Sequence, residues 1–216
     1  EMTSSLVGSE MCIRDRYNRD EHRKAVIDDI LDNWVSQSHN GKFHAILATS
    51  SIPEAIKYYK LFAQRDCGLK TTAVFDPSDG NNESSIEKID GIAQMLEDYN
   101  SLFGTCFNIS GYASFKRDVC ARLAHKTPYT AVENEPSKCL DILIVVDQML
   151  TGYDSKWLNT LYMDKFYKWS NIEMIIQAFS RTNRVFNDDK PHGIIRYYRR
   201  PYTICLLYTS DAADEL

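Results

Sequence analysis

The sequence predicts a single α/β domain in which helices cover both faces of a mostly parallel sheet. Short apolar runs such as 141–147 and 160–164 lack polar alternation, which is typical of strands buried on both faces. Segments with helical periodicity separate these runs, and a strand–helix–strand order favours parallel pairing. Neither an internal repeat nor a Gly/Ser-rich linker divides the 216 residues, so we expect one domain.

The first half of the chain contains two predicted helices and two predicted strands. Apolar residues with helical spacing predict a helix over 17–38. The short apolar run 44–48 predicts a buried strand. A second helix is expected over 52–64, because Pro53 lies in its first turn, and a second strand over 71–75. This alternation is the repeating unit of a parallel sheet.

The second half continues the alternation. The elements expected there are, in order, helices over 83–102 and 113–125, strands over 141–147 and 160–164, a helix over 171–184 and a last strand over 193–198. The connection between the first two helices is compatible with a helix, a hairpin or a loop. Among these elements, the run 141–147 is the clearest buried strand, because it is β-branched and apolar on both faces.

The two ends of the chain resemble translated adaptor DNA. Residues 11–15 can be encoded by ATG TGT ATA AGA GAC, which is complementary to a possible coding sequence for 205–210. The pair resembles both ends of a transposon-type sequencing adaptor read in frame. We therefore expect 1–16 and 205–216 to be non-native flanks, and 17–204 to be a domain cut from a longer protein.

Composition narrows the class of protein. The net charge of −5 does not identify a nucleic-acid binder, although a local basic face is compatible with it. No run approaches the roughly 18 apolar residues that a membrane span needs, so we expect no membrane association. The cysteines of 17–204 have long, irregular spacings without a CxxC pair, which predicts no metal site and a reduced, cytoplasmic protein. These cysteines are Cys67, Cys106, Cys120 and Cys139.

One predicted helix carries an amide and two guanidinium groups on one face. Gln177, Arg181 and Arg184 follow one another at intervals of four and three residues. Guanidinium groups are always charged and form paired hydrogen bonds with phosphate oxygens, so they can neutralise charge on a transferring γ-phosphate. The alternative is that both arginines are solvated, or pair with nearby acids such as Asp188 and Asp189.

A second block follows the clearest strand. Asp147 lies at the strand end, where a carboxylate could orient a partner arginine or a water molecule. Thr151 offers a hydroxyl and an N–H to a phosphate backbone, Gly152 permits close backbone approach, and Asp154 adds a second carboxylate. The alternative is a strand-capping Asp147, a turn glycine and a helix N-cap at Asp154.

A third block, Thr49-Ser50-Ser51, places hydroxyl groups between a strand and a helix start, where an oxyanion could bind. The alternative is that Ser51 is only an N-cap.

Parallel sheets bind ligands at the carboxyl ends of their strands. We therefore expect sites after Ala48, after Val146 and near the start of the helix that contains both arginines. The basic, aromatic run 196–200 suits nucleic acid, but it is also common at strand ends, and we assign it no role.

Taken in their order along the chain, the three blocks resemble the second motor domain of a superfamily-two helicase, which has the RecA-like fold, an α/β three-layer sandwich. The resemblance is strongest to the restriction (R) subunit of type I restriction–modification enzymes. Residues 143–159 resemble the motif V of that family, 177–184 its motif VI and 44–52 the region of its motif IV. The tail 190–201 is also similar.

The resemblance implies roles for individual residues. Arg184 would be the arginine finger that reaches the γ-phosphate of ATP bound by the other motor domain. Arg181 would contact the phosphates or couple the two domains, and Gln177 would help to position them. Gly152 and Asp154 would line the nucleotide cleft.

The resemblance also implies contacts with DNA and with other proteins. Thr151 and the pair Thr49-Ser50 would touch the DNA backbone without reading its sequence. The partners would be double-stranded DNA, the first RecA-like motor domain, the nuclease domain, and the methylation and specificity subunits. The sequence contains neither the GxxxxGK[ST] loop that binds ATP and Mg²⁺ nor the nuclease cluster of the family. The chain alone would therefore be an inactive fragment of an ATP-dependent, DNA-translocating endonuclease.

Two alternatives stay open at this point. The first is the second motor domain of another superfamily-two helicase or translocase. The second is an α/β module that binds a nucleotide without hydrolysing it.

Overall fold

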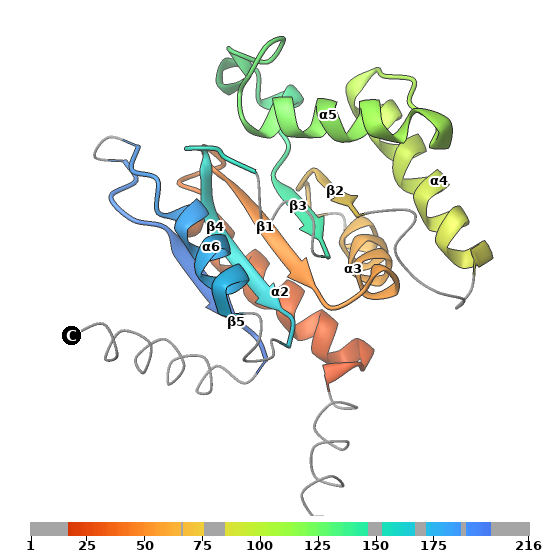
Figure 1. The fold of residues 1–216 in the computed structure, drawn as a ribbon, viewed down its shortest axis with the longest axis horizontal. Coiled ribbons are helices and arrows are strands. Elements are labelled where there is room, and N and C mark those ends of the chain that lie inside the picture. Colours follow the sequence, from red (N-terminus) through yellow and green to blue (C-terminus); the bar gives the residue numbers. More distant parts are fainter. Residues whose placement is uncertain are drawn as a thin grey trace, which may run out of the picture.

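The fold is built around one parallel sheet (Figure 1). The computed structural model describes residues 17–65, 67–75, 85–146, 153–166, 172–186 and 189–199. Both predicted flanks, 1–16 and 205–216, lie outside these residues. No helix of the described ranges is long and apolar enough to cross a bilayer.

The sheet has the strand order β2-β3-β1-β4-β5, and all four pairings are parallel. Its strands are β1 (His44–Thr49), β2 (Thr71–Val74), β3 (Ile142–Val145), β4 (Leu158–Asp164) and β5 (Ile194–Tyr197). Every residue of β1, β3 and β4 is buried, as expected for the central strands of a covered parallel sheet. Strand β3 is entirely apolar, whereas β1 and β4 also contain buried polar residues such as Thr49 and Asp164.

Helices cover both faces of this sheet. They are α2 (Asp20–Gln37), α3 (Ile52–Gln64), α4 (Ser85–Phe103), α5 (Tyr112–Leu123) and α6 (Ile172–Thr182). The step from β1 to β2 and the step from β4 to β5 run in opposite directions across the sheet. Because such crossovers are right-handed, α3 and α6 lie on opposite faces, and α6 lies in front of β4 in Figure 1. The predicted RecA-like three-layer sandwich with a mostly parallel sheet is thereby confirmed.

The local signals explain most element boundaries. Helix α3 begins where predicted, because the Ser51 side chain accepts a hydrogen bond from the Glu54 backbone N–H and Pro53 follows the cap. The connection left open between α4 and α5 is a short 3₁₀ turn over Ile109–Gly111. Helix α6 ends at Thr182, two residues before the predicted end at Arg184.

Candidate functional site

The two arginines of the predicted phosphate-binding pair contact two consecutive residues. Arg181 contacts Tyr153, and Arg184 contacts Asp154. The Arg181 guanidinium donates a hydrogen bond to the Tyr153 carbonyl oxygen at 3.0 Å. Arg184 Nε lies 2.7 Å from Asp154 Oδ1. About half of each of these two side chains is exposed, so the ion pair is open to solvent. The structure therefore brings together three predicted residues, Asp154, Arg181 and Arg184.

The segment that contacts the arginines is attached to the core through alternate residues. The Tyr153 hydroxyl is hydrogen-bonded to His44 Nε2 at 3.0 Å, and both residues are buried. Ser155 Oγ donates to the Leu123 carbonyl at the end of α5. Trp157 is also buried, whereas Asp154, which lies between Tyr153 and Ser155, is exposed. The alternation directs Asp154 outward from a fixed backbone.

The arginine pair lies at the edge formed by the amino ends of the strands, which corrects our expectation of the carboxyl edge. Asp154 precedes β4, and Arg181 is in the last turn of α6. Because α6 connects two parallel strands, it runs antiparallel to them, and its end returns to the amino edge. Arg184 also lies beyond the helix, rather than on the helical face with Gln177 and Arg181 that its spacing predicted.

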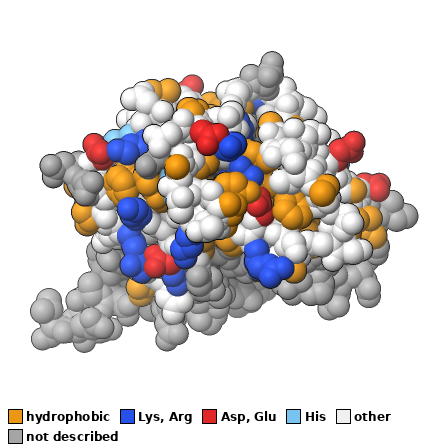
Figure 2. All heavy atoms as spheres, turned by 90° about the horizontal axis from the view of Figure 1, so that it is seen from above, with side chains coloured by type: hydrophobic (Ala, Val, Ile, Leu, Met, Phe, Trp, Pro, Cys, Tyr) orange, Lys and Arg blue, Asp and Glu red, His pale blue; other side chains and the backbone are white. Residues whose placement is uncertain are grey.

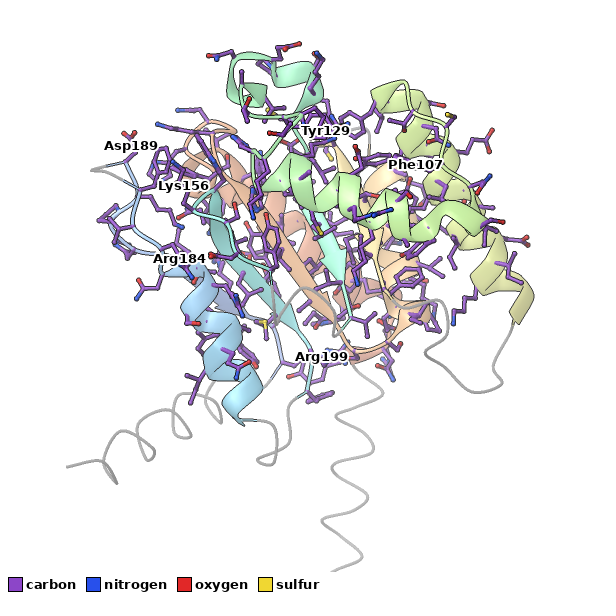
Figure 3. All side chains as sticks on the ribbon, turned by 45° about the horizontal axis from the view of Figure 1, so that its top comes forward. Phe107, Tyr129, Lys156, Arg184, Asp189 and Arg199 are labelled. Carbon is purple, nitrogen blue, oxygen red and sulfur yellow. The ribbon has the colours of Figure 1, made fainter. Side chains whose placement is uncertain are left out.

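Further cations lie on this amino edge. Figure 2 views the molecule from that side and shows Lys and Arg side chains gathered on one part of the face. Lys42 and Lys156 are both exposed there, with their ammonium groups 5.3 and 4.7 Å from the centre of the Phe186 ring. Lys42 also pairs with Asp189 at 2.5 Å. Figure 3 shows Lys156, Arg184 and Asp189 together at this end.

The opposite, carboxyl edge carries the predicted DNA-contacting pair. Thr49 is completely buried, and its hydroxyl donates to the Val145 carbonyl at 3.1 Å, so this side chain joins β1 to β3 instead of facing solvent. Ser50 is exposed. The Ser51 interpretation as a helix N-cap is confirmed.

The carboxyl edge also contains a buried carboxylate that sequence reasoning missed. Asp164, at the end of β4, has no exposed surface and accepts hydrogen bonds from His22, Tyr58 and Arg199. Burial opposes its ionisation, but hydrogen bonds from His22 and Arg199 outweigh burial and lower the pKa of Asp164 to about 2. Arg199 belongs to the basic run to which we assigned no role. Its pairing with Asp164 joins residues 35 positions apart, which no local pattern predicts.

Of the remaining predicted residues, only Gln177 lies near the arginine pair within the described ranges. Gln177 is exposed on α6, one turn before Arg181. Asp147, Thr151 and Gly152 lie outside the described residues. Within the described ranges, no group of three or more His, Cys, Asp or Glu side chains could bind a metal ion.

Two solved helicase-type structures resemble this chain only weakly. The C-terminal part of the Fun30 ATPase domain is 11% identical, with a TM-score of 0.42 over 89% of this chain and 48% of that one. Domain 2 of the Mss116p DEAD-box helicase is 12% identical, with a TM-score of 0.25 over 71% of this chain and 53% of that one.

Sequence relatives are closer. The endonuclease subunit of the type I restriction enzyme SsaAORF53P of Staphylococcus saprophyticus is 33% identical over 83% of this chain. The corresponding subunit of SauMRSORF196P of Staphylococcus aureus is 32% identical over the same share. The chain spans 19% of the length of each relative. A family model described as type I restriction enzyme subunit R domain 3 matches residues 41–200. The chain therefore belongs to the family of domain 3 of the type I restriction enzyme R subunit.

Proposed function

We propose that this chain is the second motor domain of a DNA-translocating endonuclease subunit, and that it provides Arg184 to ATP bound by another domain. The observation that carries the proposal is the convergence of Arg181 and Arg184 on Tyr153 and Asp154. Motifs that lie 28 to 30 residues apart thereby form one exposed cationic site. Family membership favours an R subunit over another superfamily-two helicase.

The chemistry follows from the two guanidinium groups. Arg181 is tied to a backbone carbonyl, so it has a fixed position, whereas Arg184 is bound only to an exposed carboxylate. An exposed ion pair of this kind is worth about 0–1 kcal/mol. A triphosphate can therefore displace Asp154 from Arg184 at little cost. Arg184 would then neutralise charge that develops on the γ-phosphate during transfer.

The other predicted residues would contribute to a nucleotide-binding surface on the amino edge of the sheet and a DNA-binding surface on the carboxyl edge. On the amino edge, Asp154 and Gly152 would line the nucleotide cleft, and Gln177 would help to orient the arginines. Asp147 follows β3, which ends at the carboxyl edge, so we assign it no contact with the arginines. ATP and Mg²⁺ would be bound mainly by the first motor domain, because this sequence has no GxxxxGK[ST] loop.

On the carboxyl edge, Ser50 would contact the DNA phosphate backbone, and Thr151 would contribute a further hydroxyl to that backbone. Such contacts position a protein on DNA without reading its sequence, as a translocating motor requires. Thr49 would support the site from inside the sheet, because its hydroxyl is bonded to Val145. The partners would be double-stranded DNA, the first motor and nuclease domains, and the methylation and specificity subunits, in the cytoplasm.

The test is ATP hydrolysis by the full-length endonuclease subunit that carries this domain. Arg184→Ala is expected to lower the rate by about 10³-fold or more, because an arginine finger acts on the transition state. Arg117→Ala is the control, since Arg117 is exposed on α5 and bonds Ser114 rather than Tyr153 or Asp154. A rate that is unchanged by Arg184→Ala would refute the arginine-finger assignment.

The exposed cations Lys42 and Lys156 favour one second candidate, a module that binds nucleotide without hydrolysis. The two proposals differ in what the isolated chain does. A completing domain binds ATP weakly by itself. Micromolar ATP binding by the isolated chain in isothermal titration, surviving Arg184→Ala, would favour the binding module instead.

A further inference from the structure

The carboxyl edge contains a buried ionic cluster that the proposed function does not use. We define the Asp164 cluster as His22, Arg23, Glu54, Tyr58, Asp164 and Arg199. We infer that Asp164 is the positioning residue of the DNA-facing edge, through which this cluster orients Ser50 and the start of α3. The inference rests on the proposed function, because it assumes that this edge binds DNA.

Every hydrogen-bonding position of the Asp164 carboxylate is used. Oδ1 accepts from His22 Nε2 at 2.8 Å and from Arg199 Nε at 2.7 Å. Oδ2 accepts from the Tyr58 hydroxyl at 2.7 Å and from Arg199 Nη2 at 3.0 Å. A carboxylate with two donors on each oxygen cannot rotate or shift without breaking a charge-assisted bond.

These bonds join four segments that are distant in the sequence. His22 comes from the start of α2, Tyr58 from α3 and Arg199 from the residues after β5, while Asp164 ends β4. A neighbouring pair reinforces the junction, since Arg23 lies 3.1 Å from Glu54 and Arg199 lies 3.9 Å from the same carboxylate. Figure 3 shows Arg199 at the end of the molecule opposite Arg184.

The cluster is continuous with the residue proposed to contact DNA. Thr49, the residue before Ser50, is paired with Asp164 in the sheet register. The Ser50 hydroxyl lies 3.4 Å from the Asp164 carbonyl oxygen. Glu54 of the cluster is in the first turn of α3. A displacement of Asp164 therefore moves the exposed hydroxyl and the helix start together.

Stability alone is a poor explanation for this arrangement. Buried ion pairs contribute little net stability, because the desolvation of both charges offsets their attraction. Fixed geometry is what they provide where one orientation has to be maintained. The low pKa of Asp164 keeps its carboxylate charged, and so keeps this geometry, at neutral pH.

A half-buried carboxylate with similar partners provides a control. Asp118 of α5 accepts hydrogen bonds from the Tyr99 hydroxyl at 2.6 Å and the Tyr129 hydroxyl at 2.5 Å, and Arg122 lies 3.4 Å away. It resembles Asp164 in chemistry, with tyrosine and arginine donors. It belongs to the α4–α5 region, beside β2, and contacts neither Ser50 nor α3 in the described structure.

The experiment measures DNA-stimulated ATP hydrolysis by the full-length subunit over a range of DNA concentrations. Asp164→Asn is expected to raise the half-saturating DNA concentration by about tenfold or more, because small misplacements of a contact are costly. The KM for ATP at saturating DNA is expected to be unchanged. Tyr58→Phe removes one bond without leaving a charge unpaired, so it is expected to shift the DNA concentration in the same direction, by less.

The controls are Asp118→Asn and Tyr99→Phe, which are expected to leave the half-saturating DNA concentration unchanged. Equal shifts in the two sets of variants would overturn the inference, and so would an effect on the KM for ATP alone. If Asp164→Asn does not fold, the half-saturating DNA concentrations of Tyr58→Phe and Tyr99→Phe are compared instead. A larger value for Tyr58→Phe supports the inference, and equal values overturn it. Hydrolysis that does not respond to DNA in the unmodified subunit, or that survives Arg184→Ala, would instead refute the proposed function.

Discussion

Tyr153 and Asp154 are neighbours in the sequence, and each contacts a different member of the arginine pair. Tyr153 is buried and uses its carbonyl for Arg181 and its hydroxyl for His44. Asp154 is exposed and uses its carboxylate for Arg184. The first contact fixes a position, and the second can be exchanged for another anion. Arg181 is therefore held in place, whereas Arg184 is available to a ligand.

His44 makes the stability of the fold sensitive to acid. Burial, reinforced by the nearby positive groups of His125 and Lys190, lowers the pKa of His44 from 6.5 to about 3. In the unfolded chain, the His44 imidazole therefore takes up a proton near pH 6.5. In the folded chain it stays neutral until about pH 3. Stability is expected to fall as the pH decreases through this window, by up to about 1.4 kcal/mol per pH unit for this histidine.

The variant His44→Gln tests that dependence. Glutamine can retain a hydrogen bond to the Tyr153 hydroxyl but does not titrate. Urea unfolding between pH 6.5 and 4 is expected to show a shallower loss of stability in this variant than in the unmodified chain. His192→Gln serves as the control, since His192 is exposed. Parallel pH profiles for all three proteins would contradict the assignment to His44.

At the scale of elements, the position of the arginine pair depends on how closely β5 approaches the end of α6. A Cβ atom built on Gly193, next to β5, would lie 2.4 Å from the Thr182 carbonyl oxygen. Only glycine permits this contact with a backbone atom. Thr182 is the last residue of α6 and follows Arg181 directly. The packing that closes the sheet edge therefore also locates the pair.

Gly193→Ala is expected to lower the free energy of unfolding by about 1–3 kcal/mol, because the end of α6 has to move away. Urea unfolding measures the loss. Gly91→Ala is the comparison: its Cβ would meet only the ends of the Ile56 side chain, at 2.9 Å, and a side chain can rotate away. A smaller cost at Gly193 than at Gly91 would show that the contact with α6 is loose.

The sequence predicts the elements well and their spatial relations less well. Short, largely apolar runs identified β1, β3 and β4, and Pro53 identified the start of α3. The edge at which the arginines lie was predicted wrongly, because spacing along a helix does not say which end of the sheet that helix approaches. The role of Asp164 was missed, because its partners come from three other segments. The assignments of Asp147, Thr151 and Gly152 stay predictions.

At the scale of the whole molecule, the sheet separates two surfaces of different chemistry. The amino edge presents exposed cations, and the carboxyl edge presents Ser50 above the Asp164 cluster. Strand β1 runs from His44 at one edge to Thr49 at the other, a distance of roughly 20 Å for six residues. Under the proposed function, this separation would let a nucleotide bind at one edge while DNA binds at the other.

We propose that Arg184 acts on the transition state of ATP hydrolysis rather than on nucleotide binding in general. The most direct test compares the affinities of the full-length subunit for ADP and for ADP with aluminium fluoride, which mimics the transferring phosphate. Arg184→Ala is expected to weaken binding of the mimic by about 10³-fold and to leave the affinity for ADP almost unchanged. Equal losses for both ligands, or no loss for the mimic, would contradict the account.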